Sequence, residues 1–145
     1  MKISYLHIRN FKSIRDLEIS DVENALILVG KNNTGKTAVI DAIRMVCGDY
    51  AVTKYDYLES DKSISVEMTV DFEEEDLLLY YSMGLVSKYK KYELWVKDFM
   101  AKLPSFQEGK ITVYYTVNNE GYEKYSDGIK KNNPYIKSIL PKLYH

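Results

Sequence analysis

The sequence predicts an α/β fold, with helices packed on a mixed sheet that has a substantial antiparallel component. Three observations lead to this prediction. Residues 25–29 form a short, continuous apolar run of the kind found in fully buried strands. Residues 37–47, a few positions later, carry apolar side chains at helical spacing. Residues 64–72 and 111–117 alternate apolar and polar side chains, as antiparallel strands with one solvated face do.

The first part of the chain predicts two further strands. Residues 2–11 have apolar side chains at both parities, so this strand is either covered on both faces or interrupted by a bulge. Residues 16–20 predict a second short strand, and residues 21–24 a turn that leads into the buried run at 25–29. The chain therefore builds part of a sheet before it reaches that buried strand.

The helix predicted over 37–47 is followed by Gly48, the usual type of residue for leaving a helix in the left-handed conformation. The apolar side chains of this helix leave Asp41 and Arg44 for its outer face. Residues 49–62 show no clear period, which predicts an ordered loop or a short helical turn.

The second half of the chain predicts two helices, a hairpin and a short final helix. The acidic run at 73–76 suits a helix N-terminus, and a longer amphipathic helix follows over 85–103. Residues 111–125 predict a hairpin, because two short strands flank a polar loop that contains glycine. A short helix then begins at Asn133 with proline in its first position.

An eight-residue stretch at 30–37, Gly-Lys-Asn-Asn-Thr-Gly-Lys-Thr, lies between the buried strand and the first helix. It fits G-x-x-x-x-G-K-[ST], the phosphate-binding loop, at every fixed position. A chance match in a glycine-containing turn is the alternative, and the flanking strand and helix argue against it. In such a loop the backbone N–H groups and the start of the helix point at an anion.

The residue types in this stretch predict their roles. Gly30 and Gly35 let the backbone come close to the phosphates of a nucleoside triphosphate, and Asn33 suits the tight turn. Lys36 is expected on the β- and γ-phosphates, and the Thr37 hydroxyl on Mg²⁺. We therefore expect ATP and Mg²⁺ as cofactors, with Thr37 as the metal ligand. The expected ATP contacts from this stretch are Gly30, Asn32, Asn33, Thr34, Gly35, Lys36, Thr37 and Ala38.

Composition bounds the remaining possibilities. The chain has 145 residues without a linker, repeat or low-complexity tract, which indicates one domain. No stretch approaches the roughly 20 consecutive apolar residues that a membrane span needs. The single cysteine, Cys47, is compatible with the reducing cytoplasm, where we expect the protein. The net charge of −1 does not predict a nucleic-acid-binding domain, and the basic run at 88–91 fits a solvated face better than a DNA contact.

Residues 1–48 resemble a known group of ATPases. The sequence Ile-Arg-Asn-Phe-Lys-Ser-Ile at 8–14 ends the first strand, and the phosphate-binding loop follows at 30–37 with its Asn-Asn pair. This combination resembles the amino-terminal lobe of the ABC-type P-loop ATPases of the SMC, RecF and RecN group. Within that group it looks most like the OLD-family ATP-dependent nucleases, including Gabija-type endonucleases. Residues 64–145 agree with the group only in their pattern of elements and in the Ile-Leu-Pro-Lys sequence at 139–142.

The resemblance implies an ATP-binding lobe in which Lys12 and Ser13 also lie near the nucleotide. It further implies that catalysis uses parts not identified in this chain. These parts are a Walker B strand that ends in Asp-Glu, an LSGG-like signature from a second protomer, a switch histidine and, in OLD proteins, a metal-binding TOPRIM nuclease domain. We therefore expect residues 1–145 to form a single ATP-binding lobe, divided into 1–48 and 49–145, that belongs to a longer ATPase.

The same resemblance implies a role in DNA-directed processes such as repair or phage defence. The expected partner is a second copy of the chain or a full-length ATPase protomer. DNA contact would come through the missing domains, and no membrane contact is expected. The isolated chain would bind ATP without appreciable turnover.

Two other functions stay open at this point. A compact, self-sufficient P-loop NTPase or kinase could use Asp71, because residues 68–73 superficially resemble a Walker B ending. The alternation of that strand, with Glu67 in its middle, instead favours an edge or antiparallel strand. A non-catalytic interaction module could retain the loop and act through protein contacts. Gln107, the only glutamine, could sense Mg²⁺ as in the resembled family, although a surface loop explains it better.

Overall fold

A computed structural model gives the fold of the protein and describes residues 2–22, 33–85 and 87–140. The described strands are β1 (Lys2–Phe11), β2 (Ile14–Ile19), β3 (Ile64–Asp71), β4 (Lys110–Val117) and β5 (Glu123–Ser126). The described helices are α2 (Asn33–Val46), α3 (Glu74–Ser82), α4 (Tyr92–Lys102) and α5 (Tyr135–Ile139), with a short 3₁₀ turn, η1 (Lys54–Asp56).

The strands form one sheet in the order β2-β1-β3-β4-β5, and every neighbouring pair is antiparallel. The antiparallel component that the sequence predicts is thus confirmed, as is the α/β class. No parallel pairing occurs among the described strands, and the buried strand expected at 25–29 lies outside the described residues. The register of β1 against β3 shifts between Ile3 and Tyr5, which is a bulge, one of the two alternatives that the mixed parity of residues 2–11 predicts.

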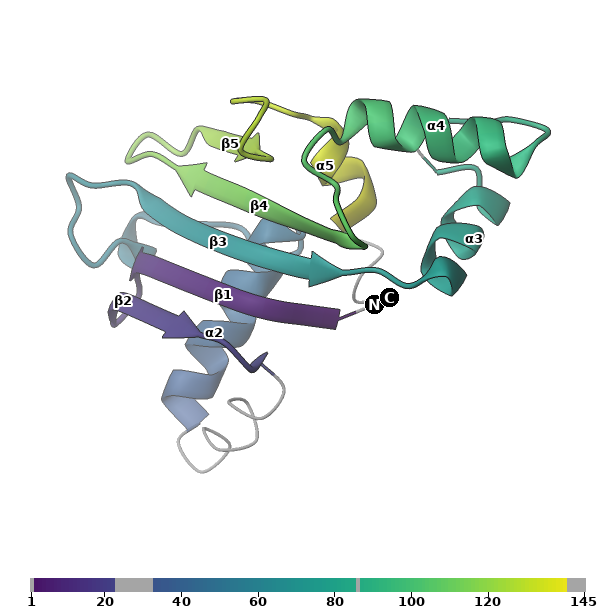
Figure 1. The fold of residues 1–145 in the computed structure, drawn as a ribbon. Coiled ribbons are helices and arrows are strands. Elements are labelled where there is room, and N and C mark those ends of the chain that lie inside the picture. The colour runs from purple at the N-terminus through teal and green to yellow at the C-terminus, as the bar shows by residue number, and fades with distance from the viewer. Residues whose placement is uncertain (1, 23–32, 86, 141–145) are drawn as a thin grey trace.

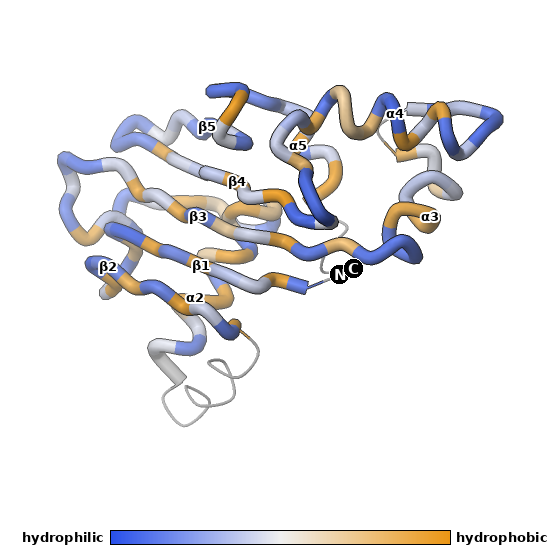
Figure 2. The backbone as a smooth tube through the Cα atoms, viewed as in Figure 1, coloured by the Kyte–Doolittle hydropathy of each residue, from blue (hydrophilic) through white to orange (hydrophobic). Residues whose placement is uncertain are grey.

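Helix α2 covers one face of the sheet, behind β1 and β3 in the view of Figure 1. The buried side of the helix includes Val39, Ala42, Ile43 and Val46, which belong to the same apolar cluster as the inward side chains of the strands. Figure 2 shows the corresponding alternation of apolar and polar residues along the strands. The apolar burial between helix and sheet fixes where the start of α2 lies relative to the rest of the fold.

Helices α3 and α4 lie beyond the end of the sheet where β3 ends and β4 begins (Figure 1). Their contact is made by aromatic side chains: the centroid of the Tyr81 ring lies 5.4 Å from that of Tyr92 and 6.1 Å from that of Trp95. The Trp95 indole N–H donates to the carbonyl of Leu85 at 2.8 Å, so the largest buried side chain has its polar atom paired. The two helices lie away from the start of α2 (Figure 1).

Three expectations need correction. Strand β3 is antiparallel, as predicted, but it is the central strand of the sheet and not an edge. Helix α2 begins at Asn33, earlier than the predicted residue 37. Asp41 does not face solvent: it is only 8% exposed, because a lysine from the β1–β2 turn covers it. Gly48 has φ +86°, so the predicted left-handed exit from the helix is confirmed.

Candidate nucleotide-binding site

The last residues of the phosphate-binding loop form the start of α2. Gly35, Lys36 and Thr37 lie in its first turns, with Lys36 half-buried and Thr37 exposed. The first turn carries no acidic residue, so the positive end of the helix dipole is not neutralised there. This arrangement suits an anion in front of the helix.

The structure describes only some of the other residues expected to contact ATP. Gly30 and Asn32 lie outside the described residues, as do the side chains of Asn33 and Thr34. Ala38 is 3% exposed and packs into the apolar interior, so only its backbone could face a ligand. The described part of the loop is therefore its helical end.

The turn between β1 and β2 is held in place by hydrogen bonds and contains two residues in left-handed geometry. Asn10 has φ +60° and Lys12 has φ +54°, conformations that cost energy for residues with a Cβ unless the surroundings hold them. The backbone N–H of Lys12 donates to the Asp56 carbonyl at 2.7 Å. This bond ties the turn to the segment that follows α2.

Asn10 ties the turn to the same segment through its side chain, which is almost fully buried. Its Oδ1 accepts from the backbone N–H of Glu59 at 2.7 Å. Its Nδ2 donates to the carbonyls of Glu59 at 3.1 Å, Lys62 at 2.9 Å and Ser63 at 3.3 Å. The backbone of the turn is thus fixed on both sides of Phe11.

The side chain of Lys12 reaches across to α2. Its Nζ lies 2.7 Å from Oδ2 of Asp41, and it also lies 5.0 Å from the centroid of the Tyr50 ring. The Asp41 carboxylate is 11% exposed and its other oxygen lies 3.4 Å from Nη1 of Arg44. The hydrogen bond that Lys12 donates to Asp41 raises the pKa of Lys12 against the opposing effect of burial, so the ammonium form is favoured.

The position of this ion pair on α2 relates it to the phosphate-binding loop. Asp41 follows Thr37 by four residues, so the two side chains lie on the same face of the helix, one turn apart. Four residues correspond to about 6 Å along the helix axis. The structure therefore brings Lys12 to the helix that begins with the phosphate-binding residues. That Lys12 lies near a nucleotide, as the resemblance implies, stays a prediction. Ser13 is exposed in the same turn.

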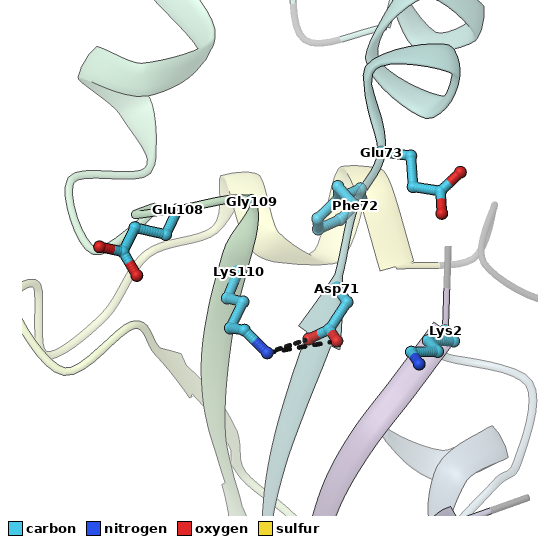
Figure 3. Close-up of a pocket in the computed structure, with 7 residues that line it drawn as sticks. All are labelled: Lys2, Asp71, Phe72, Glu73, Glu108, Gly109 and Lys110. Atoms are coloured by element: carbon cyan, nitrogen blue, oxygen red, sulfur yellow. Dashed lines mark hydrogen bonds and ion pairs between the residues drawn. The ribbon is translucent and has the colours of Figure 1, made fainter.

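Asp71 lies at the other end of the sheet. Its register partner on β1 is Lys2, whereas Lys12 follows the opposite end of that strand. Ten residues of strand span roughly 30 Å. The Asp71 carboxylate accepts from Ser4 Oγ at 2.9 Å and lies 3.3 Å from Nζ of Lys110, as Figure 3 shows for the lysine.

This placement argues against Asp71 as a Walker B carboxylate. The start of α2 lies beyond β2, away from the end of β3 that carries Asp71 (Figure 1). The mixed-charge cavity beside Asp71, about 500 Å³ in volume, includes Lys2 and Lys110 but none of the described residues of the phosphate-binding loop. Gln107 is exposed in the tight turn that leads into β4 at Lys110, so it lies at this same end and not near Thr37.

Metal ligands beyond Thr37 are not apparent in the part of the chain that the structure describes. No group of three or more His, Cys, Asp or Glu side chains could hold a metal ion within residues 2–22, 33–85 and 87–140. Mg²⁺ would thus depend on the nucleotide itself for much of its coordination, as is usual where a phosphate-bound Mg²⁺ keeps few protein ligands. The Thr37 hydroxyl, exposed at the helix start, is free of steric cover for that role.

Sequence reasoning missed the partner of Lys12. The sequence pattern predicts that Asp41 faces solvent, because the apolar positions of the helix occupy the other face. The available signal was its spacing: a carboxylate one turn after Thr37 on the phosphate-binding helix, in a chain where the resemblance places a lysine near the nucleotide. Nothing in the periodicity of α2 connects residue 41 to residue 12.

Comparison with known proteins defines the class. The family described as AAA ATPase domain matches residues 1–143, and the chain belongs to this family. It is therefore a domain of the ATP-binding ATPase class. An uncharacterized protein of Methanocaldococcus jannaschii is 35% identical over 43 residues, which are 30% of this chain and 20% of that protein. The chain thus spans about a fifth of the length of this curated relative.

The described helices also bear on membrane association. None of those in residues 2–22, 33–85 and 87–140 is long and apolar enough to cross a membrane.

Proposed function

We propose that this chain is the ATP- and Mg²⁺-binding amino-terminal lobe of an OLD/RecF-like ATPase that acts in DNA-directed processes such as repair or phage defence. One observation carries the nucleotide part of the proposal. A Gly-Lys-Thr sequence lies in the first turns of a helix that has no acidic residue in its first turn, and a second cation, Lys12, is held on the same helix face one turn later. Two cations beside a helix N-terminus suit a polyphosphate.

Each residue of the loop has a proposed contact with the phosphates or with Mg²⁺. Backbone N–H groups of the loop, including those of Asn32, Asn33, Thr34 and Gly35, wrap the phosphates, while Lys36 contacts the β- and γ-phosphates. The Thr37 hydroxyl binds Mg²⁺, which bridges the phosphate oxygens. Gly30, Ala38, Lys12 and Ser13 complete the proposed contact set.

Turnover is proposed to need groups from elsewhere. A water-orienting carboxylate must lie near the terminal phosphate. Near the start of α2 the structure describes Asp41, and that carboxylate is engaged by Lys12 and Arg44. We propose that a second copy of the chain or a full-length ATPase protomer supplies the missing groups, and that DNA is contacted through other domains in the cytoplasm.

Titration calorimetry with Mg²⁺-ATP tests the binding proposal. Lys36→Ala removes a charge-assisted contact to the phosphates, so the affinity should fall by ~10-fold or more. The matched control is Lys97→Ala, which removes an exposed lysine of α4 far from the site and should leave the affinity unchanged. Equal affinities for the wild-type protein and Lys36→Ala would show that the loop does not hold the nucleotide.

A further inference from the structure

The Lys12–Asp41 pair has features that an ordinary surface salt bridge lacks. The Lys12 backbone is held in left-handed geometry at φ +54° by its N–H bond to Asp56. The side chains are 29% and 11% exposed, so the pair is partly shielded from water, unlike a fully exposed surface ion pair. Because the Lys12 backbone is fixed and its side chain is flexible, the ammonium can change position while the backbone stays in place.

The surroundings of Asp41 allow the lysine to leave. Arg44 is a second cation on the same carboxylate, with Nη1 at 3.4 Å from Oδ1. Arg44 is itself tied down, since its Nη2 donates to the Asp49 carbonyl at 3.0 Å. If Lys12 moves away, Asp41 keeps a positive neighbour and does not become an unpaired, shielded charge, which would be costly.

The surroundings of Lys12 favour a short movement over a large rearrangement. The turn residues on both sides are fixed, because Asn10 is bonded to the segment 59–63 and the Lys12 N–H to Asp56. The ammonium also lies 5.6 Å from the Phe11 ring and 5.0 Å from the Tyr50 ring, two weak contacts that a flexible lysine can exchange. Rotation about its four-carbon stem can carry the ammonium along the face of α2 toward Thr37, one turn away.

We propose that Asp41 is a competing anchor for Lys12 and thereby regulates nucleotide binding at this site. Without nucleotide, Asp41 holds the ammonium one turn away from the phosphate-binding residues. With a nucleoside triphosphate bound, Lys12 leaves Asp41 for the terminal phosphate, and Arg44 remains on Asp41. This inference rests on the proposed function, because it requires that the start of α2 binds a nucleotide.

Competition between Asp41 and the triphosphate for Lys12 makes the effect of Asp41 depend on Lys12, whereas general charge repulsion does not. Removing the Asp41 charge releases Lys12, so it should tighten binding of the triphosphate more when Lys12 is present. A negative charge near the site also repels any phosphate, and that general effect does not depend on Lys12. A double-mutant cycle separates the two, since it reports the coupling between residues 12 and 41 alone.

The experiment is titration calorimetry with Mg²⁺-ATP and Mg²⁺-ADP on the wild-type chain, Asp41→Asn, Lys12→Met and the double variant. We expect Asp41→Asn to bind ATP up to about 5-fold more tightly, the range of a partly exposed ion pair. Lys12→Met should bind ATP more weakly with little change for ADP. In its background Asp41→Asn should tighten ATP binding clearly less than it does in the wild type, because only the general electrostatic effect remains. Arg44→Gln removes the cation that remains on Asp41 after Lys12 leaves, so it should lower the ratio of ATP to ADP affinity. Lys97→Ala, which removes an exposed lysine of α4, is the matched control and should leave this ratio unchanged.

The outcomes distinguish a failure of the anchor hypothesis from a failure of the proposed nucleotide-binding function. If Asp41→Asn tightens ATP binding equally with and without Lys12, the effect is general electrostatics and the anchor hypothesis is wrong, although the proposed function stands. The same conclusion follows if Lys12→Met binds ATP as the wild type does while Lys36→Ala does not. If the wild-type chain binds neither nucleotide, both the proposed function and the inference are wrong. Thermal unfolding of each variant checks folding, and Asp41→Ser takes the place of Asp41→Asn in the cycle if the asparagine variant does not fold.

Discussion

Asn10 offers a quantitative test of how the β1–β2 turn is held, because one side chain makes all of its bonds to a distant segment. Asn10→Ala would leave the backbone N–H of Glu59 without the acceptor it now has at 2.7 Å. A buried N–H that loses its partner costs about 1–3 kcal/mol. Alanine at φ +60° adds strain, because a left-handed residue with a Cβ costs about 1–2 kcal/mol and asparagine tolerates it better. We expect the free energy of unfolding to fall by about 2–4 kcal/mol.

Urea denaturation with linear extrapolation measures this loss. Asn10→Gly separates the two contributions, since glycine removes the same hydrogen bonds but adopts a positive φ without strain. It should be about 1 kcal/mol more stable than Asn10→Ala. Asn119→Ala is the control, because Asn119 is exposed in the β4–β5 loop. A loss below about 0.5 kcal/mol for Asn10→Ala, the usual range for a surface substitution, would refute the view that Asn10 holds the turn.

Three further predictions follow from the placement of single groups. Asp71→Asn should leave the Mg²⁺-ATP affinity in calorimetry unchanged, because Asp71 pairs with Lys110 at the opposite end of the sheet; a clear loss with the fold intact would restore the Walker B interpretation. The isolated chain should release no phosphate from ATP at rates near ~1 per second, the low end of ordinary turnover, and a rate of that size that disappears in Lys36→Ala would contradict the need for a second protomer. Burial raises the pKa of the Cys47 thiol from 9.0 to about 12, so the folded state keeps the thiol protonated. The stability that this gives is complete below the unfolded pKa and declines as pH rises above about 9, so urea midpoints should fall from pH 8 to pH 10 in the wild type and less in Cys47→Ala.

The sequence by itself determined most of the described elements, and it predicted the chemistry of the loop. Alternation at residues 64–72 was enough to predict an antiparallel strand with one open face, because successive side chains of a strand point to opposite faces. The loop at 30–37 predicted a phosphate site, because glycine, lysine and threonine at that spacing have few other uses between a strand and a helix. Gly48 predicted the end of α2 for an equally local reason, its freedom at positive φ.

Only the tertiary structure decided which distant residues meet. Periodicity places Asp41 on one side of its own helix, but whether that side faces water depends on what the sheet brings against it. Here the β1–β2 turn, fixed by Asn10, brings Lys12 onto Asp41 across 29 positions of sequence. The same holds for Asp71, whose distance from the phosphate-binding helix follows from the antiparallel pairing of β1 with β3. A sequence pattern repeats over a few residues and reports the neighbours within one element, whereas a contact between elements depends on how the whole apolar core packs.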